Sequence, residues 1–454
     1  MTRHISLVLA VAALAPTVGA QQRPEIRQLG PVVATSSETF GPLVFVRHLK
    51  SGVLVNDQAN RRLLKLDEML ANPTVVADST PATASAYSGR SAGLIAYRGD
   101  SSLFVDPGSM SMYLVDGDGK LGRVMSVPRS QDALALGNAP LGNATFDGQG
   151  HLVYRGFGGM RFNLGGAGAG PARAEAARRV EVAAGGGSGQ IMMPALPESS
   201  AVVRVNLATR AVDTLAWVRI PRVKMDIQRD EATGNMRASA VMNPLPTVDE
   251  WAVLSDGSVA VLRGRDYHID WIRPNGTRES SAKIPFDWQR LTDEDKVTFM
   301  DSLKAARERF LATQPAPPAP QVSSSTTTGP GGMQQRTMVA MGGPGAGAAG
   351  GNPMEMAMGR NMQFVPPEEL PDYKPPFFTG AVRADADGNV WVLTVPTKAV
   401  AGGPIYDVIN AKGELTERVQ IPKDRTIIGF GEGGIVYLGV RNGTRTTLEK
   451  AKVR

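Results

Sequence analysis

Six copies of one short pattern constrain this chain more than any other feature. In each copy a glycine or serine is followed by a run of apolar or β-branched residues. The copies begin at Gly52, Ser102, Gly150, Gly257, Gly388 and Gly434. A small residue of this kind opens a hairpin turn, and the run that follows it is a strand. The sequence therefore predicts six similar β units.

The spacing of these copies predicts how the units are arranged. The intervals are 50, 48, 107, 131 and 46 residues. Three of them match one blade of a β-propeller, which takes roughly 40–50 residues. The two long intervals hold insertions, one Gly/Ala-rich at 156–197 and one at 290–376 that contains a helix and low-complexity sequence. We therefore expect an all-β, six-bladed β-propeller over residues 27–454.

The two ends of this region predict how the last blade is completed. The sixth repeat supplies at most three strands before the chain ends, and residues 27–34 form an early strand that can supply the fourth. A ring closed in this way leaves no open sheet edge to template aggregation. We expect the N-terminal strand to close the propeller.

The second insertion contains the one clear helix of the sequence. Thr292 is a good N-cap, and three acidic residues follow it in the first turn. Apolar residues then recur at helical spacing, namely Val297, Met300, Leu303, Ala306 and Phe310. Residues 321–362 are rich in Ser, Thr, Gly, Ala and Met, and they cannot bury enough apolar surface to offset their ordering entropy. We expect them to form a disordered Gly/Met-rich loop.

The N-terminus predicts export. A basic start at Arg3 precedes an apolar stretch at 7–18 and a small-residue cleavage site that ends at Ala20. We interpret residues 1–20 as a signal peptide, because the apolar stretch is too short to cross a bilayer and no later stretch approaches that length. The chain has no cysteine, which excludes disulfides, thiolate nucleophiles, Cys-based zinc sites and a lipoprotein anchor. We expect a monomer that is periplasmic or secreted and has no transmembrane segment.

Two segments carry a resemblance to known proteins. They are Asp385–Val392 and Ser255–Val261, and each has an Asp–Gly turn followed by a strand. They resemble exported bacterial six-bladed β-propellers of the NHL or TolB-like kind, and the resemblance covers the mature chain apart from the two insertions. It implies the architecture and a platform for binding. A fold does not fix chemistry, and many members of such families are uncharacterised.

Residues that precede the inner strands of a propeller line one mouth of its channel. The positions of this kind are Glu38, Arg90, Asn138, Asp249, Thr379 and Arg425. A funnel of mixed charge with two arginines suits a small polar or anionic ligand, although a merely hydrated channel needs no ligand at all. The preferred function is an exported, non-catalytic platform without a cofactor. Its partner would be a small polar ligand or a protein of the cell envelope.

The alternative function is a divalent-metal-dependent hydrolase. Six-bladed enzymes of the gluconolactonase or regucalcin type hold a divalent ion on the axis with Glu, Asn and Asp side chains, and a resemblance to them implies such an ion here. Glu38, Asn138, Asn143 and Asp249 lie at suitable places, but they also fit a set of polar residues that line a wet channel. Calcium or another divalent ion is expected only under this alternative.

Three further candidate metal sites, two for calcium and one for copper, have simpler explanations. Asp116–Gly119 and Asp385–Gly388 each place two carboxylates at a turn. An EF-hand loop that starts at Asp116 needs a Glu at its twelfth position, where this chain has Val127. Asp and Gly are also the residues that hairpin turns prefer. The methionines of Met354–Met358 suit Cu(I), or they belong to a low-complexity segment without a ligand.

Nucleophilic catalysis and nucleic-acid binding are not expected. There is no Gly-x-Ser-x-Gly elbow, and the Ser-x-x-Lys match at Ser280–Lys283 lies in a strand pattern rather than at the start of a helix. The formal charge of +6 is scattered along the chain. No interleaving of aromatic and basic residues of the base-stacking kind occurs.

Overall fold

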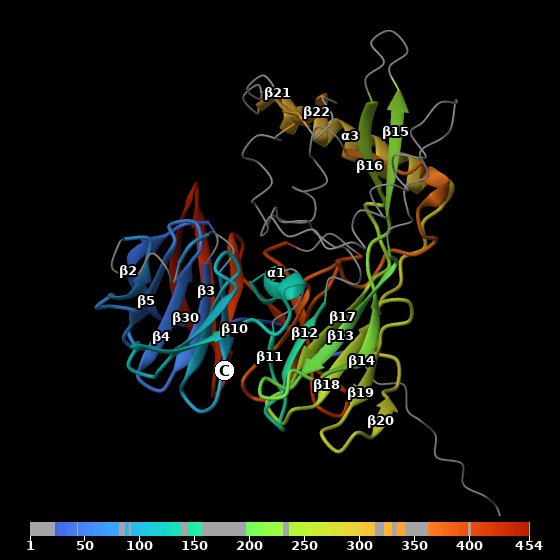
Figure 1. Ribbon diagram of the computed structural model, residues 1–454. Helices are drawn as coiled ribbons and strands as arrows, with labels where there is room; N and C mark the ends of the chain where they lie inside the picture. Colours follow the sequence, from blue (N-terminus) through green and yellow to red (C-terminus); the bar gives the residue numbers. More distant parts are fainter. Residues whose placement is uncertain are drawn as a thin grey trace, which may run out of the picture.

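The computed structural model of the chain describes residues 23–42, 44–80, 87–89, 92–137, 144–156, 197–229, 236–313, 322–328, 334–340, 362–397 and 401–453. The described part is mostly β (Figure 1). Six of its sheets have four strands that follow one another in antiparallel order, and one of the six carries an additional fifth strand. We number these sheets I to VI along the chain.

Each sheet is identified by its strands. Sheet I contains β3 (Val44–Leu49), β4 (Gly52–Asp57), β5 (Arg62–Leu66) and β6 (Thr74–Asp78). Sheet II contains β7 (Gly93–Ala96), β8 (Ser102–Asp106), β9 (Ser111–Val115) and β10 (Leu121–Ser126). Sheet III contains β11 (Thr145–Phe146), β12 (Leu152–Arg155), β13 (Ser199–Val205) and β14 (Val212–Arg219).

The second half of the chain forms the other three. Sheet IV contains β17 (Asp249–Val253), β18 (Val259–Arg263), β19 (His268–Ile272) and β20 (Arg278–Ser280). Sheet V contains β24 (Val382–Ala384), β25 (Val390–Leu393), β26 (Ile405–Ile409), β27 (Leu415–Gln420) and the added strand β1 (Ile26–Gln28). Sheet VI contains β28 (Arg425–Gly431), β29 (Ile435–Asn442), β30 (Arg445–Lys452) and β2 (Val32–Phe40).

The six repeated patterns of the sequence are the second strands of the six sheets, β4, β8, β12, β18, β25 and β29. These strands are covered on both faces. In β4, for example, every residue is buried. The alternation of side chains sends Leu54 toward sheet II, whereas Val53 and Val55 pack with Tyr437 of sheet VI. A strand buried on both faces needs a continuous apolar run, and that run made the pattern visible in the sequence.

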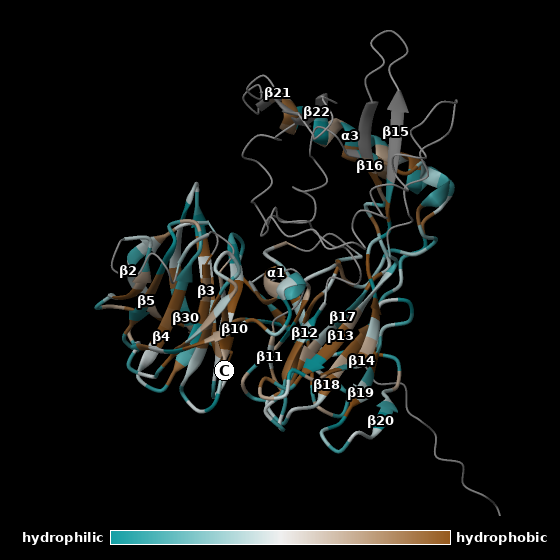
Figure 2. Ribbon diagram, viewed as in Figure 1, coloured by the Kyte–Doolittle hydropathy of each residue, from teal (hydrophilic) through white to brown (hydrophobic). Residues whose placement is uncertain are grey.

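Apolar clusters join each sheet to the next. One such cluster lies between each consecutive pair from I and II to V and VI, and a sixth lies between VI and I. First strands also lie against first strands, since β28 contacts β3, β3 contacts β7, β7 contacts β11 and β17 contacts β24. Figure 2 shows the apolar residues within the sheets and the hydrophilic ones mainly at the turns.

The N-terminal segment differs from the single strand expected at 27–34. It forms two strands that join different sheets, because β1 pairs in parallel with β27 and β2 pairs antiparallel with β30. Pro31 lies between them and has no N–H to continue a ladder. Gly30 passes so close to the backbone that an added Cβ would lie 2.4 Å from the oxygen of Lys452. β2 completes sheet VI, as the sequence predicts, and β1 extends sheet V.

The long connections leave the sheets on one side, which we call the insertion face. It is the side where first strands begin and second strands end. The connections are β12 to β13, β14 to β17 and β20 to β24. They carry α3 (Asp293–Thr313), the 3-10 turn η3 (Pro367–Glu369), and a small sheet of β15 (Val223–Arg229), β16 (Met236–Met242) and β23 (Met362–Phe364). In Figure 1 α3, β15 and β16 lie above sheets III and IV.

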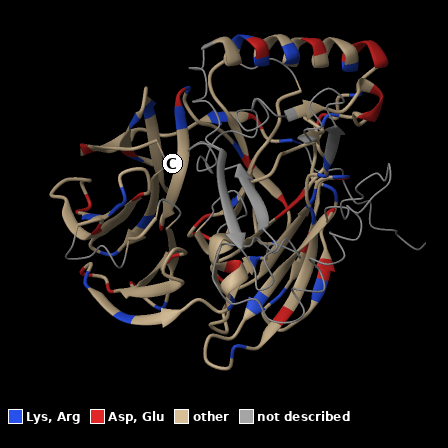
Figure 3. Cartoon of the chain, turned by 45° about the horizontal axis from the view of Figure 1, so that its top comes forward, with Lys and Arg blue, Asp and Glu red and all other residues tan. Residues whose placement is uncertain are grey.

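The structure bears out the predicted cap of helix α3. The Thr292 hydroxyl accepts a hydrogen bond from the Asp295 N–H at 3.2 Å, and the Asp295 carboxylate accepts one from the Thr292 N–H at 2.9 Å. Met300 and Leu303 are buried as expected, but Val297 is 47% exposed. Charges of both signs alternate along the helix (Figure 3).

Several elements have no counterpart in the sequence-based expectation. A short helix α1 (Ala133–Gly137) follows the 3-10 turn η1 (Ser130–Asp132) and packs between sheets II and III. Within residues 321–362, where disorder is expected, β21 (Val322–Thr328) pairs with β22 (Gln334–Ala340). Met362 begins β23, and the remaining residues of that segment, those of the insertion at 157–196 and those of the predicted signal peptide lie outside the described residues.

Candidate functional site

The structure describes four of the six predicted mouth residues, and all four lie toward the insertion face. Asp249 begins β17, Arg425 begins β28 and Thr379 lies shortly before β24. Glu38 lies near the end of β2, the edge strand of sheet VI, shortly before β3 begins at Val44. Arg90 and Asn138 lie outside the described residues, as does Asn143.

Asp249 holds the start of sheet IV together. Its carboxylate accepts hydrogen bonds from the Arg219 N–H at 3.1 Å, from Arg263 at 2.9 Å and from the Gly264 N–H at 3.3 Å. These partners come from the end of β14 and the end of β18. Both carboxylate oxygens are engaged inside the protein, so the contacts indicate a structural role for Asp249.

Arg425 and Glu38 are paired with neighbours as well. Arg425 makes a bidentate contact with Glu449 of β30, with N–O distances of 2.6 and 3.0 Å. Glu38 lies 3.6 Å from Arg62 of sheet I, and its side chain is partly exposed. The structure therefore does not bring these two residues together with Asp249 and Thr379.

A different acid, Glu250, lies close to the insertion face near the start of β17. It follows Asp249 in β17 and therefore points to the other side of the strand. Its side chain is fully buried, and its Oε1 accepts a hydrogen bond from the Gly380 N–H at 3.0 Å. Arg155, the last residue of β12, approaches the same oxygen at 3.5 Å and is itself 4% exposed. Sheets III, IV and V thus meet at this carboxyl group.

Two buried polar atoms near the Glu250 carboxyl group lack hydrogen-bond partners of ordinary geometry. The buried Oε2 of Glu250 and the buried hydroxyl oxygen of Thr379 make no hydrogen bond of ordinary geometry to any described residue. Buried polar groups in native proteins are nearly always hydrogen-bonded, and each exception calls for a specific explanation. Thr379 precedes Gly380 in sequence, so both atoms belong to the same small region.

Burial changes the protonation of this acid. Desolvation is the largest cause and raises the pKa of Glu250 to about 7, while Arg155 and the Gly380 N–H oppose the rise. Burial lowers the pKa of Arg155, and Glu250 opposes that change. A carboxyl group that titrates near neutral pH accepts hydrogen bonds when ionised and also donates one when protonated. Glu250 can therefore match either kind of polar group.

Sequence reasoning missed Glu250 and Arg155 although a signal was present. Arg155 ends the apolar run of β12, and Glu250 is the residue just before the apolar part of β17. In strands that are buried on both faces, a charged residue at the end of the run is desolvated by the neighbouring sheets. The sequence prediction considered residues that precede the strands, so it included Asp249 and missed Glu250.

The Asp–Gly turns agree with the simpler explanation given for them. Asp385 accepts hydrogen bonds from the N–H groups of Asp387 and Asn389 at 3.0 and 2.8 Å. Its other oxygen accepts from the side chains of Asn389 and Trp391. Asp116 likewise accepts from the N–H groups two and four residues later. These carboxylates stabilise their own turns.

The three histidines in the described part of the chain are distributed over three sheets. His48 Nδ1 contacts the Tyr437 hydroxyl at 2.8 Å, His151 contacts Asp147 at 3.2 Å, and His268 contacts Asp266 at 2.8 Å. Within the part of the chain that the structure describes, no group of three His, Asp or Glu side chains has a metal-binding arrangement.

The Ser-x-x-Lys match does not assemble a nucleophile with its base. Ser280 donates to Asp270, whereas Lys283 is 74% exposed and lies 3.9 Å from Asp266. Residues 341–361, which contain the Met354–Met358 cluster, are outside the described ranges. Among the helices that the structure describes, none has the length and apolar composition needed to cross a membrane.

Comparisons with known proteins give weak likenesses. No family model matches the chain, and no curated protein matches its sequence. A gluconolactonase from Xanthomonas campestris matches with a TM-score of 0.33 and 12% identity over 96% of this chain and 99% of that one. The calcium-binding protein regucalcin from Agrobacterium tumefaciens matches with a TM-score of 0.35 and 12% identity over 94% of this chain and 98% of that one. TolB from Acinetobacter baumannii matches with a TM-score of 0.32 and 9% identity over 90% of this chain and 63% of that one. With TM-scores below 0.5, these likenesses place the chain in no family.

Proposed function

We propose that the chain is an exported six-bladed β-propeller that binds a small polar ligand at its insertion face without catalysis. In this proposal sheets I to VI are the blades, and β2 closes the ring. The apolar clusters between consecutive sheets support the architecture, the sixth cluster above all, because it joins sheet VI to sheet I.

One observation carries the binding proposal. The Glu250 Oε2 and the Thr379 hydroxyl are buried at the meeting point of three sheets and lack partners of ordinary geometry. A ligand hydroxyl, amide or ammonium group that reaches either atom would satisfy it, and the loss of an unsatisfied buried group favours binding by about 1–3 kcal/mol. The long connections at this face contain residues that could enclose such a ligand.

The proposal is tested by a ligand screen on the mature chain. Thermal melts with neutral sugars, sugar acids and amino acids are compared among the wild type, Glu250→Gln, Thr379→Val and the matched control Glu38→Gln, whose side chain is partly exposed. We expect a compound whose stabilising effect is lost in the first two variants and kept in the control. A stabilising effect that survives in both site variants, or the absence of any stabilising compound, would refute binding at this site.

The alternative, a divalent-metal-dependent hydrolase, is favoured by the same Glu250 oxygen, which lacks a hydrogen-bond partner of ordinary geometry. Elemental analysis of protein purified without chelator, followed by melts with EDTA and with added calcium, separates the two functions. A stoichiometric ion that disappears in Glu250→Gln and whose removal lowers the melting temperature supports the hydrolase. An unchanged melting temperature with EDTA, together with no bound ion, supports the non-catalytic platform.

A further inference from the structure

Arg383 lies among apolar residues in the middle of an inner strand. It is the central residue of β24, the first strand of sheet V, and it remains partly accessible to solvent. Val382 and Ala384 on either side of it pack with the apolar cluster between sheets IV and V. Because side chains alternate along a strand, Arg383 points to the other face of sheet V, toward sheet VI.

The guanidinium group of Arg383 has no counterion. It makes no hydrogen bond and no ion pair with any residue in the described part of the chain, and none of its nitrogen atoms is closed off from solvent. Burial lowers the pKa of Arg383, and no carboxylate of the described residues opposes this change. Arginine is rarely placed in a protein interior without a partner, because an uncompensated buried charge is costly.

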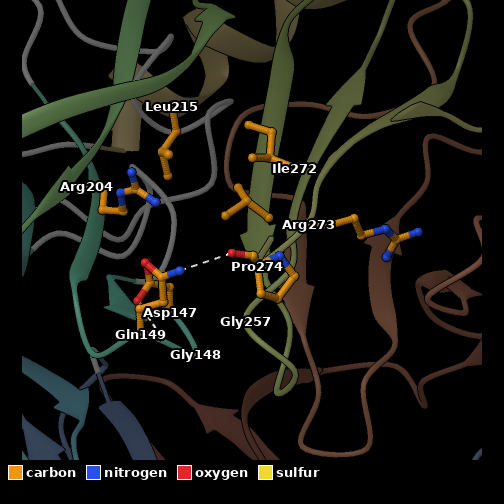
Figure 4. Close-up of a pocket in the computed structure, with 10 residues that line it drawn as sticks. Asp147, Gly148, Gln149, Arg204, Leu215, Gly257, Ile272, Arg273 and Pro274 are labelled. Atoms are coloured by element: carbon orange, nitrogen blue, oxygen red, sulfur yellow. Dashed lines mark hydrogen bonds between the residues drawn. The ribbon is translucent and has the colours of Figure 1, made fainter. Parts of the chain in front are cut away.

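Other partly buried arginines have an acidic partner. Arg204 contacts Asp213 at 3.3 Å, and Arg273 contacts Glu279 at 2.5 Å. Figure 4 shows both arginines beside the small cavity between sheets III and IV, which has a volume of about 20 Å3. That volume holds about one water molecule, so it leaves no room for a larger ligand. Arg383 differs from these two arginines because its charge is not compensated within the described residues.

Tyr406 supplies a second donor on the same face of sheet V. It belongs to β26 and packs in the apolar cluster between sheets V and VI. Tyr406 opposes the effect of burial on the pKa of Arg383, and Arg383 opposes the rise that burial causes in the pKa of Tyr406. A mutual electrostatic effect of this kind requires two groups that lie close together. The Tyr406 ring contacts Trp391, but its hydroxyl has no hydrogen-bond partner among the described residues.

Aromatic rings surround these two donors. Arg383 pairs with Trp391 in the ladder of β24 and β25, and the Trp391 ring lies 6.0 Å from the Tyr406 ring and 5.2 Å from the Phe430 ring of sheet VI. The indole N–H of Trp391 donates to Asp385 at 2.9 Å. Asp385 also accepts hydrogen bonds from two backbone N–H groups of its own turn, so it is not available to Arg383. The guanidinium and the phenol are therefore donors that lack an acceptor.

We propose that Arg383 and Tyr406 bind a small oxyanion, a carboxylate or a phosphate, between sheets V and VI. The planar fork of a guanidinium matches two oxygens of such an anion, and the phenol hydroxyl donates to an oxygen as well. The site uses neither Glu250 nor Thr379, so it stands or falls independently of the proposed function.

Calorimetric titrations and thermal melts of the full mature chain test the proposal. The probes are sodium acetate and sodium phosphate, and sodium chloride at the same ionic strength is the reference. We expect at least one of the two oxyanions to bind in a one-to-one complex and to raise the melting temperature, because a ligand that binds only the folded state stabilises it. Binding of acetate alone assigns a carboxylate site, and binding of phosphate alone assigns a phosphate site. Equal binding of chloride, or no binding of either oxyanion, overturns the proposal.

Three variants and a matched control locate the site. Arg383→Gln should weaken oxyanion binding about tenfold or more, because it removes charge-assisted hydrogen bonds. Arg383→Lys keeps the charge without the planar fork and should retain part of the affinity. Tyr406→Phe should weaken binding by a smaller factor. Arg222→Gln changes an exposed arginine that pairs with Glu198 at 3.1 Å, and it should bind the oxyanion as the wild type does.

Circular dichroism melts establish which variants fold. If Arg383→Gln does not fold, Arg383→Lys and Tyr406→Phe decide the test. Unchanged affinity in folded Arg383→Gln, or in both of the other variants, contradicts the assignment. Glu250→Gln should keep oxyanion binding, and its loss there would place the anion near Glu250 and overturn the proposed site.

Discussion

The replacement of Glu250 by Gln tests how the buried acid is ionised. Burial raises its pKa from an ordinary value of 4.5 to about 7. Between these two values the unfolded chain has lost its proton while the folded chain still holds it. The unfolded state then binds fewer protons, so the free energy of unfolding falls as the pH rises. The contribution of Glu250 to stability is complete below its unfolded pKa and is lost once the pH has passed through about 7.

The size of this effect follows from the same two values. One pH unit corresponds to about 1.4 kcal/mol, so the interval from 4.5 to about 7 corresponds to roughly 3 kcal/mol. Gln resembles the protonated acid, since it carries no charge and its oxygen can accept the hydrogen bond from Gly380. The variant should match the wild type at about pH 4.5 and exceed it by roughly 3 kcal/mol at about pH 8.5.

Urea unfolding followed by tryptophan fluorescence provides the assay, since the chain contains five tryptophans. The difference between wild type and variant at each pH isolates Glu250, because other titrating groups cancel. Glu38→Gln serves as the matched control and should show a difference within about 0.5 kcal/mol at every pH, as expected of a surface substitution.

A variant that is less stable than the wild type, and more so at high pH, would refute this reasoning. That result would mean that the carboxylate is ionised in the folded state and held by Arg155. The removal of one partner from a buried ion pair costs about 3–5 kcal/mol, so the two outcomes differ in sign as well as in size.

Three further predictions concern the scaffold. Gly52 has a φ of +135°, and an added Cβ would lie 2.1 Å from the Leu66 oxygen. Gly52→Ala should therefore lower the free energy of unfolding by more than about 1 kcal/mol. The control Ala96→Gly in the same assay should lower it by only about 0.5–1 kcal/mol. Thr292→Ala should cost about 1 kcal/mol of unfolding free energy through the lost cap of α3, and Thr292→Ser should restore most of it. Mass spectrometry of protein collected from the periplasm or medium should give a chain that begins at Gln21, and an intact Met1 on exported protein would contradict the predicted signal peptide.

The sheets were readable from the sequence because their second strands are buried on both faces. β4, for example, appears as an unbroken apolar run after a glycine, and its turn chemistry marks where it begins. First strands gave a weaker signal. β11 has only Thr145 and Phe146 in its ladder, and such a short segment shows no periodicity.

The site was harder to predict because it depends on which sheets are neighbours. Glu250 and Arg155 are far apart in sequence, and each looks like an ordinary charged residue at a strand end. Only the packing of sheets III, IV and V removes water from both. Likewise, Pro31 shows that the early strand is interrupted, but no local pattern says that the preceding residues join sheet V.

Sheet VI also has a consequence for the order in which the chain can fold. Its strand β2 comes from the N-terminal part and its other strands from the C-terminal part. The Leu448 N–H, for instance, donates to the Ser36 hydroxyl across 412 positions of sequence. Because a ribosome or a translocation channel releases the chain from its N-terminus, β2 emerges first and must wait for its partner until nearly the whole chain is present. Contacts of such long range slow folding, and during the wait Val32 and Val33 belong to an unpaired strand that other chains can capture. A holding chaperone should therefore matter most for the earliest residues to emerge.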